Sequence, residues 1–156
     1  MKLFKPVTFF GLAVAALALA PTALPAENPA LAEPAKSVFN HYLKIQGDLV
    51  NDSLNGVAEN AGAIAKAVAG DKIKMLPATV ATEAAALAKA SDLKSARAAF
   101  KLLSDSLIKY LADHKVKDAY VRVYCPMANA SWLQADKRVA NPFMGKEMAE
   151  CGEIQN

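Results

Sequence analysis

The sequence predicts an all-α fold: an up-and-down bundle of about four helices, then an irregular Cys/Met-rich C-terminal segment that ends in a short helix. Three observations support this prediction. Apolar residues recur at helical spacing between residues 35 and 110. Glycine, proline or capping residues interrupt the pattern at short intervals. Alanine is abundant in this region, so neighbouring helices can approach one another closely.

The first 26 residues have the composition of a secretory signal peptide. Lys2 and Lys5 precede an uncharged apolar run over residues 7–20, and small residues follow it. The run is shorter than the roughly 20 residues that a transmembrane helix needs, which favours a removed leader over a retained anchor. Cleavage after Ala26 and cleavage after Ala32 are both acceptable. We therefore expect a periplasmic location.

The charge balance argues against nucleic acid as a partner. The whole chain has a formal net charge of +3, and removal of Lys2 and Lys5 with the leader lowers it to +1, or slightly more if Glu27 is also removed. Nucleic-acid binding requires a basic surface, which such a near-neutral chain does not predict. No later stretch is apolar enough for a membrane span after signal cleavage. We expect a Pro-rich tether at residues 27–34 and one domain at residues 35–156.

The first two helices are predicted from residue 35 to Gly70. Asp52 is the expected N-cap of the second helix, and Gly70 is expected to end it. The apolar stripes of the two helices are formed by Val38, Tyr42, Ile45 and Leu49, and by Leu54, Val57, Ala61, Ile64 and Val68.

A third helix is predicted over residues 79–89 and a fourth from about residue 93 to residue 110. Ser91 and Asp92 offer an N-cap for the fourth helix, although the two helices are also compatible with one continuous helix. The apolar face of the fourth helix comprises Leu93, Ala96, Phe100, Leu103, Leu107 and Tyr110.

The pattern changes after His114. Residues 120–124 are β-branched and aromatic with alternation, which predicts either one short strand without a visible partner or an extended segment lying on the bundle. Further on, Asn141 suits an N-cap, Pro142 the first helical position and Gly152 the position after a helix. These signals predict a short helix of about ten residues within the sulfur-rich segment 120–154.

Sulfur side chains suggest a metal site in this segment. Met144, Met148 and Cys151 would share one face of the short helix. Cys125 and Met127 would point to the same side if their segment is extended. Thiolates and thioethers select copper(I) or silver(I) over hard cations. The predicted ligands are Cys125, Met127, Met148 and Cys151, with Met144 as a further candidate and Trp132 as an aromatic shield.

Other interpretations of the same residues remain open. The only two cysteines of an exported protein usually pair, so a Cys125–Cys151 disulfide is an alternative to a metal site. His41 or His114 could add a nitrogen ligand, but both are distant in the sequence. A structural zinc site would need more Cys and His at closer spacing. No nucleophile motif is visible and the carboxylates fall on solvated helix faces, so we expect no enzymatic activity.

The C-terminal residues also carry a family resemblance. The residues concerned are Tyr124-Cys125-Pro126-Met127, Trp132-Leu133-Gln134, Val139-Ala140-Asn141-Pro142-Phe143, Gly145, Met148 and Cys151-Gly152-Glu153. Together they resemble the signature of an uncharacterised bacterial periplasmic domain that occurs alone or fused to adaptor subunits of copper/silver efflux pumps. Upstream, Tyr42-Leu43 and residues 49–52 are similar to the opening of that domain, so the resemblance covers residues 38–154. Where the family shows an aromatic pair after Asn-Pro, this chain has Phe143 followed by Met144.

The expected function is therefore binding or relay of copper(I) or silver(I) in the periplasm, linked to heavy-metal efflux or resistance. The family resemblance implies an efflux adaptor or another copper carrier as the partner. The alternative is a disulfide-stapled helical module that binds protein and no metal. A thiol-redox protein is a third option, although the cysteines do not form a close pair motif.

Overall fold

The computed structural model of the chain describes residues 28–155. The predicted signal peptide at residues 1–26 lies outside these residues. Within them, no helix is both long and apolar enough to cross a membrane.

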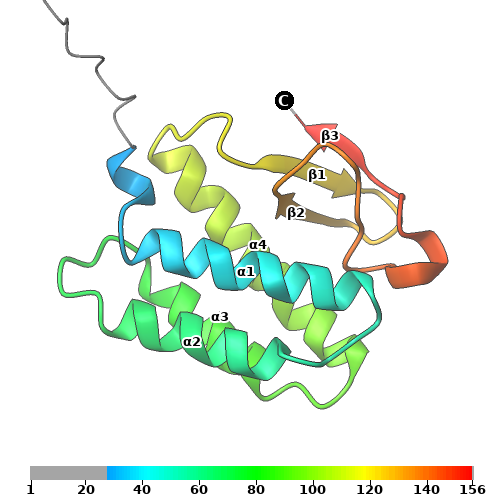
Figure 1. Cartoon of the computed structure of the whole chain (residues 1–156), viewed down its shortest axis with the longest axis horizontal. Coiled ribbons are helices and arrows are strands. Elements are labelled where there is room, and N and C mark those ends of the chain that lie inside the picture. The colour runs from blue at the N-terminus through cyan, green and yellow to red at the C-terminus, as the bar shows by residue number, and fades with distance from the viewer. Residues whose placement is uncertain (1–27, 156) are drawn as a thin grey trace, which may run out of the picture.

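Four helices form where the apolar periodicity predicts them. They are α1 (Ala35–Val50), α2 (Val57–Ala69), α3 (Ala78–Ala88) and α4 (Leu93–Asp113). Each helix packs against the next one along the chain, and α1 and α4 also lie against the sheet (Figure 1). The predicted stripes are buried, with Val38, Tyr42, Ile64, Phe100 and Leu107 at zero exposure.

Capping decides whether the third and fourth helices are continuous. The Asp92 carboxylate accepts a hydrogen bond from the Ser95 amide at 2.7 Å, and the Asp92 amide donates to the Ser95 hydroxyl at 3.4 Å. This reciprocal pair is a capping box, which starts a new helix. The two helices are therefore separate.

The predicted cap at Asp52 is wrong. Helix α2 begins at Val57, and its N-cap is Gly56 at φ 79°. Asp52 lies in the preceding turn, with a positive φ of 53°. Its carboxylate bonds to Arg97 on α4 instead of to the start of α2, because the turn carries it towards the C-terminal segment.

The all-α prediction is also wrong, because the C-terminal region contains a three-stranded antiparallel sheet. The strands are β1 (Val121–Cys125), β2 (Ala130–Gln134) and β3 (Glu153–Gln155), in the order β2-β1-β3. Val123 pairs with Trp132 of β2 on one side and with Ile154 of β3 on the other. The predicted lone strand thus has two partners. Both are short, and neither has the β-branched composition that identifies β1 in the sequence.

The predicted ten-residue helix near the C-terminus is likewise wrong. Only a short 3₁₀ helix forms there, η2 (Gly145–Met148). Gly145 adopts φ +57°, outside the right-handed helical region, so the chain cannot continue as an α-helix through it. Met144, Met148 and Cys151 therefore do not share one α-helical face.

The sheet is covered on both faces at β2, where all five residues are buried. Tyr42 of α1 joins the helices to the sheet, because its hydroxyl lies 2.8 Å from the Ser104 hydroxyl and accepts a hydrogen bond from the Leu133 amide at 3.1 Å. On the other face, the segment from residue 135 to residue 152 wraps over Trp132, whose ring meets Phe143 edge-on at 5.9 Å. This second layer carries the candidate site (Figure 1).

The described part of the expected tether lies on the bundle. Residues Pro29–Leu31 form a 3₁₀ helix, η1, capped by the Asn28 side chain. The Tyr110 hydroxyl donates a 2.7 Å hydrogen bond to the Ala30 carbonyl, and Ala30 is buried. The domain therefore includes residues that precede the first long helix.

Candidate functional site

The structure brings the two cysteines together. Cys125 ends β1, and Cys151 lies two residues before β3. The register that pairs Tyr124 with Glu153 puts the segment before β3 beside the end of β1. The two sulfur atoms are 2.7 Å apart. Cys125 has zero exposure, whereas Cys151 is half-buried, so solvent reaches the pair from the Cys151 side.

Asn141 holds the loop that carries Cys151. Its buried side chain donates a 2.6 Å hydrogen bond to the Cys151 carbonyl and accepts hydrogen bonds from the Phe143 and Met144 amides at 2.8 and 3.0 Å. Its own amide donates to the Ala149 carbonyl at 2.7 Å. The side chain accepts from following amides as predicted for an N-cap, but here it organises a loop rather than a long helix.

Gly152 allows this loop to close on the sheet. A Cβ atom at this position would lie 2.7 Å from Trp132 Cη2 and 2.7 Å from Val123 Cγ1. Any side chain here would therefore push the loop, and the adjacent Cys151, away from β1. Trp132 itself has zero exposure, and its indole nitrogen donates to Gln134 at 3.0 Å, so it is a core residue beneath the loop.

A second set of polar contacts fixes the other end of the loop. Arg97 donates to Asp52 Oδ1 at 2.5 Å and to the Pro142 carbonyl at 2.8 Å, and the Lys146 amide donates to Asp52 Oδ2 at 3.1 Å. We call these contacts the Asp52–Arg97 clamp. Sequence reasoning missed it, since it joins residues about 45 positions apart and the one local signal is the glycine at position 145.

The surroundings of the two thiols shift their pKa values in opposite directions. Burial raises the pKa of Cys125, but hydrogen bonds from Cys151, from the Ala128 and Met127 amides and from Asn141 outweigh it and hold this pKa below its usual value. The pKa of Cys151 is raised, first by its hydrogen bond to Cys125 and then by burial. Cys125 is therefore the residue that becomes a thiolate first, and the Cys151 thiol keeps its proton and donates a hydrogen bond to it.

The three predicted methionine ligands differ in exposure and in the segment that carries them. Met127 lies in the β1–β2 turn and is 64% exposed. Because Pro126 and Met127 are in a turn, the extended arrangement expected for Cys125 and Met127 does not occur. Met144 is half-buried against the core, and Met148 is half-buried in η2, where its carbonyl accepts from the Cys151 amide at 3.0 Å.

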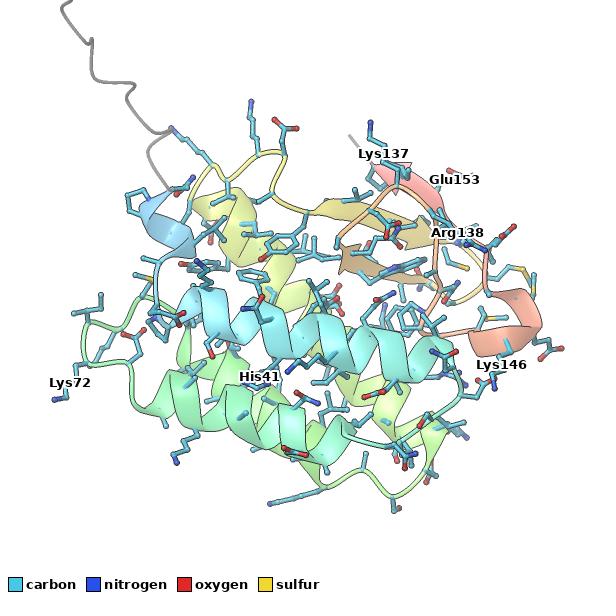
Figure 2. All side chains as sticks on the ribbon, viewed as in Figure 1. His41, Lys72, Lys137, Arg138, Lys146 and Glu153 are labelled. Carbon is cyan, nitrogen blue, oxygen red and sulfur yellow. The ribbon has the colours of Figure 1, made fainter. Side chains whose placement is uncertain are left out.

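The sulfur atoms drawn in Figure 2 lie mostly at the end of the molecule that carries η2 and Lys146. Over residues 28–155, no group of three or more His, Cys, Asp or Glu side chains is arranged to hold a metal ion.

Neither histidine belongs to the site. His41 Nδ1 lies 2.8 Å from Asn60 Oδ1, between α1 and α2, and Figure 2 places it away from the Lys146 end. His114 Nδ1 lies 2.9 Å from the Tyr110 carbonyl at the end of α4.

Comparison with known proteins assigns the chain to a family. Residues 38–119 match the family described as Protein of unknown function (DUF3347), and the chain belongs to this family. The matched region covers the four helices, apart from the first three residues of α1, and ends before β1, so the sulfur pair lies outside it. Neither a curated protein nor a solved structure matches the chain.

Proposed function

We propose that the protein is a periplasmic carrier that binds copper(I) or silver(I) through Cys125 and Cys151 and passes the ion on without catalysis. The observation that carries the proposal is the convergence of two thiols from segments 26 residues apart, one of them with a lowered pKa. Thiolate sulfur is the preferred ligand of these soft monovalent ions. The geometry supplies a ligand pair that solvent can reach from one side.

The chemistry follows from the asymmetry of the pair. Cys125 offers the first thiolate, and an approaching cation makes loss of the Cys151 proton easier, since metal binding and thiol deprotonation are coupled. The thioether of Met148, three residues before Cys151, is the candidate third ligand, with Met144 and Met127 further out. A half-buried Cys151 would allow a partner's ligand to enter before the protein's own ligands leave.

The cellular context rests on the leader and on the resemblance of the C-terminal motif. An N-terminal signal peptide would deliver the protein to the periplasm of a bacterium. An efflux adaptor or another cuprous carrier would then be the natural partner, in heavy-metal efflux or resistance.

The test is a copper(I) titration of the reduced protein, without its leader, against a competing chelator. One ion per chain at sub-micromolar affinity is expected, with at least tenfold loss in Cys125→Ser and Cys151→Ser and a smaller loss in Met148→Leu. Met75→Leu is the matched control, because Met75 lies between α2 and α3. Absence of tight binding, or equal binding by the cysteine variants, would refute the proposal.

A disulfide-stapled interaction module is the second candidate. The 2.7 Å separation favours it, since sulfur atoms this close need little movement to bond. A bridge would close a loop containing β2 and η2 and would stabilise the fold by about 3–4 kcal/mol on chain-entropy grounds. Counting free thiols in protein taken directly from the periplasm separates the two: two free thiols support the carrier, and none supports the staple.

A further inference from the structure

A second concave site lies at the opposite end of the sheet from the cysteines. It is a groove of about 820 Å³ between the C-terminal half of α4 and the strands. It exists because α4 packs mainly on β2, at one edge of the sheet, so that β1 and β3 extend beyond the helix. Its apolar lining is formed by Ile108, Leu111, Val116, Tyr120, Val121 and Leu133.

The mouth of this groove is basic. Lys117, Arg122 and Lys137 line it and are exposed, whereas Asp118 is the one carboxylate among the lining residues. Over residues 28–155, none of the three cations has a hydrogen-bond or salt-bridge partner. Figure 2 shows Lys137 beside the β3 ribbon, at the upper edge of the molecule. Three cations without a partner among the described residues surround an apolar groove. A ligand that complements both features carries a negative charge and an apolar group.

We infer that this groove binds a small amphipathic anion, a single acyl chain with a carboxylate head. The volume lies within the range of about 300–1,000 Å³ that is usual for small-molecule sites. The acyl chain would lie along Val116 and Val121, which are half-buried, and the carboxylate would face Lys117 and Lys137. Ile154, which is 42% exposed on β3, provides an apolar lip.

A second copy of the chain fits this surface less well. In a two-fold dimer the same patch meets itself, so the three cations would face three cations. A neutral apolar ligand would leave the basic mouth unused. Charge complementarity therefore selects the anion.

The test is calorimetric titration of the protein, without its leader, with dodecanoate below its micellar concentration. Saturable one-to-one binding is expected, and Lys117→Glu/Lys137→Glu should weaken it about tenfold or more. The control is Lys66→Glu/Lys89→Glu, which makes the same charge change on α2 and at the end of α3. Dodecyltrimethylammonium, with the opposite head charge, should bind at least tenfold more weakly.

Two alanine-to-phenylalanine variants of α4 test whether the ligand binds in the groove. Ala112→Phe fills the groove from α4 and should abolish binding, whereas Ala98→Phe, at an exposed position on the same helix, should leave it unchanged. Circular dichroism confirms that both variants fold. Absence of binding, equal affinity for the cation, or retained binding in folded Ala112→Phe would overturn the inference. Sedimentation that shows a dimer blocked by Ala112→Phe would assign the groove to a second copy instead.

Discussion

Gly145→Ala is the perturbation that best tests how the fold builds the sulfur site. Gly145 starts η2 and adopts φ +57°, a backbone conformation that costs an alanine about 1–2 kcal/mol. It is also in close contact with the Asp52–Arg97 clamp. An added Cβ atom would lie 1.9 Å from Asp52 Oδ1 and 2.4 Å from an Arg97 guanidinium nitrogen. The substitution must therefore move at least the Asp52 carboxylate and the Arg97 guanidinium, which breaks the clamp that holds the loop.

The expected magnitude combines two effects. Overpacking of this kind typically costs about 1–3 kcal/mol in addition to the backbone strain. We expect a total loss of roughly 2–5 kcal/mol in the free energy of unfolding, and a fall of roughly 8–20 °C in Tm for a domain of this size.

Urea and thermal unfolding of the reduced protein measure the effect. Gly47→Ala is the matched control, because nothing lies within 4 Å of a Cβ atom at that position and Gly47 is inside α1. It should stabilise the fold by about 0.5–1 kcal/mol, since alanine favours a helix interior over glycine. If Gly145→Ala were as stable as the parent, the clamp would not constrain the loop and the reasoning would be refuted.

Three further predictions follow from single contacts. Tyr42→Phe should lower the free energy of unfolding by about 1–3 kcal/mol in urea titrations, because it leaves two buried hydrogen-bonding groups without their partner; a neutral effect would contradict the role of this hydroxyl. The pKa of Asp52 is lowered, first by its hydrogen bond from Arg97, so its stabilising effect is present above about pH 4 and is lost as the pH falls through the folded-state pKa. Urea midpoints at pH 6 and pH 3 should therefore differ less in Asp52→Asn than in the parent, and an unchanged difference would exclude this linkage. In the native reduced protein, iodoacetamide should label the half-buried Cys151 and spare Cys125, because the reagent cannot reach a side chain with zero exposure even though Cys125 has the lower pKa of the two; mass spectrometry would contradict the geometry by finding Cys125 labelled first.

The helices could be predicted because their signals are local. The stripe from Val38 to Leu49 fixes the buried face of α1, and the same periodicity fixes the buried face of α4. The cap at Asp92 acts over three residues, so it can be read from the sequence alone. Asp52 shows the limit of such reasoning. Its carboxylate binds the guanidinium of Arg97, which is far away in the sequence, instead of capping the next helix.

The sheet could not be predicted because its pairing is long-range. β1 was expected as either one short strand or an extended segment, and its second partner, β3, is only three residues long and lies about 30 positions further along the chain. The N-cap signal at Asn141 was read correctly as a side chain that accepts from following amides. The helix expected after it was wrong, because Gly145 adopts φ +57° and the chain cannot continue as an α-helix through it.

The sulfur site was predicted in part. The pairing of Cys125 with Cys151 was one of the arrangements expected from the sequence, and the structure places the two sulfur atoms side by side. The positions of the methionines depended on the helix that does not form, so their participation stays a prediction. The three methionines differ in two respects. Met127 is the most exposed of them, and Met148 is the one nearest to Cys151 in the sequence.

X-ray absorption at the copper edge of the reduced protein loaded with one copper(I) per chain tests the central proposal most directly. Coordination by two or three sulfur atoms is expected, with no nitrogen or oxygen neighbour, and it should be lost in Cys125→Ser/Cys151→Ser. A first shell dominated by nitrogen or oxygen, or a sulfur shell that survives in this double variant, would contradict the assignment of the ion to this thiol pair.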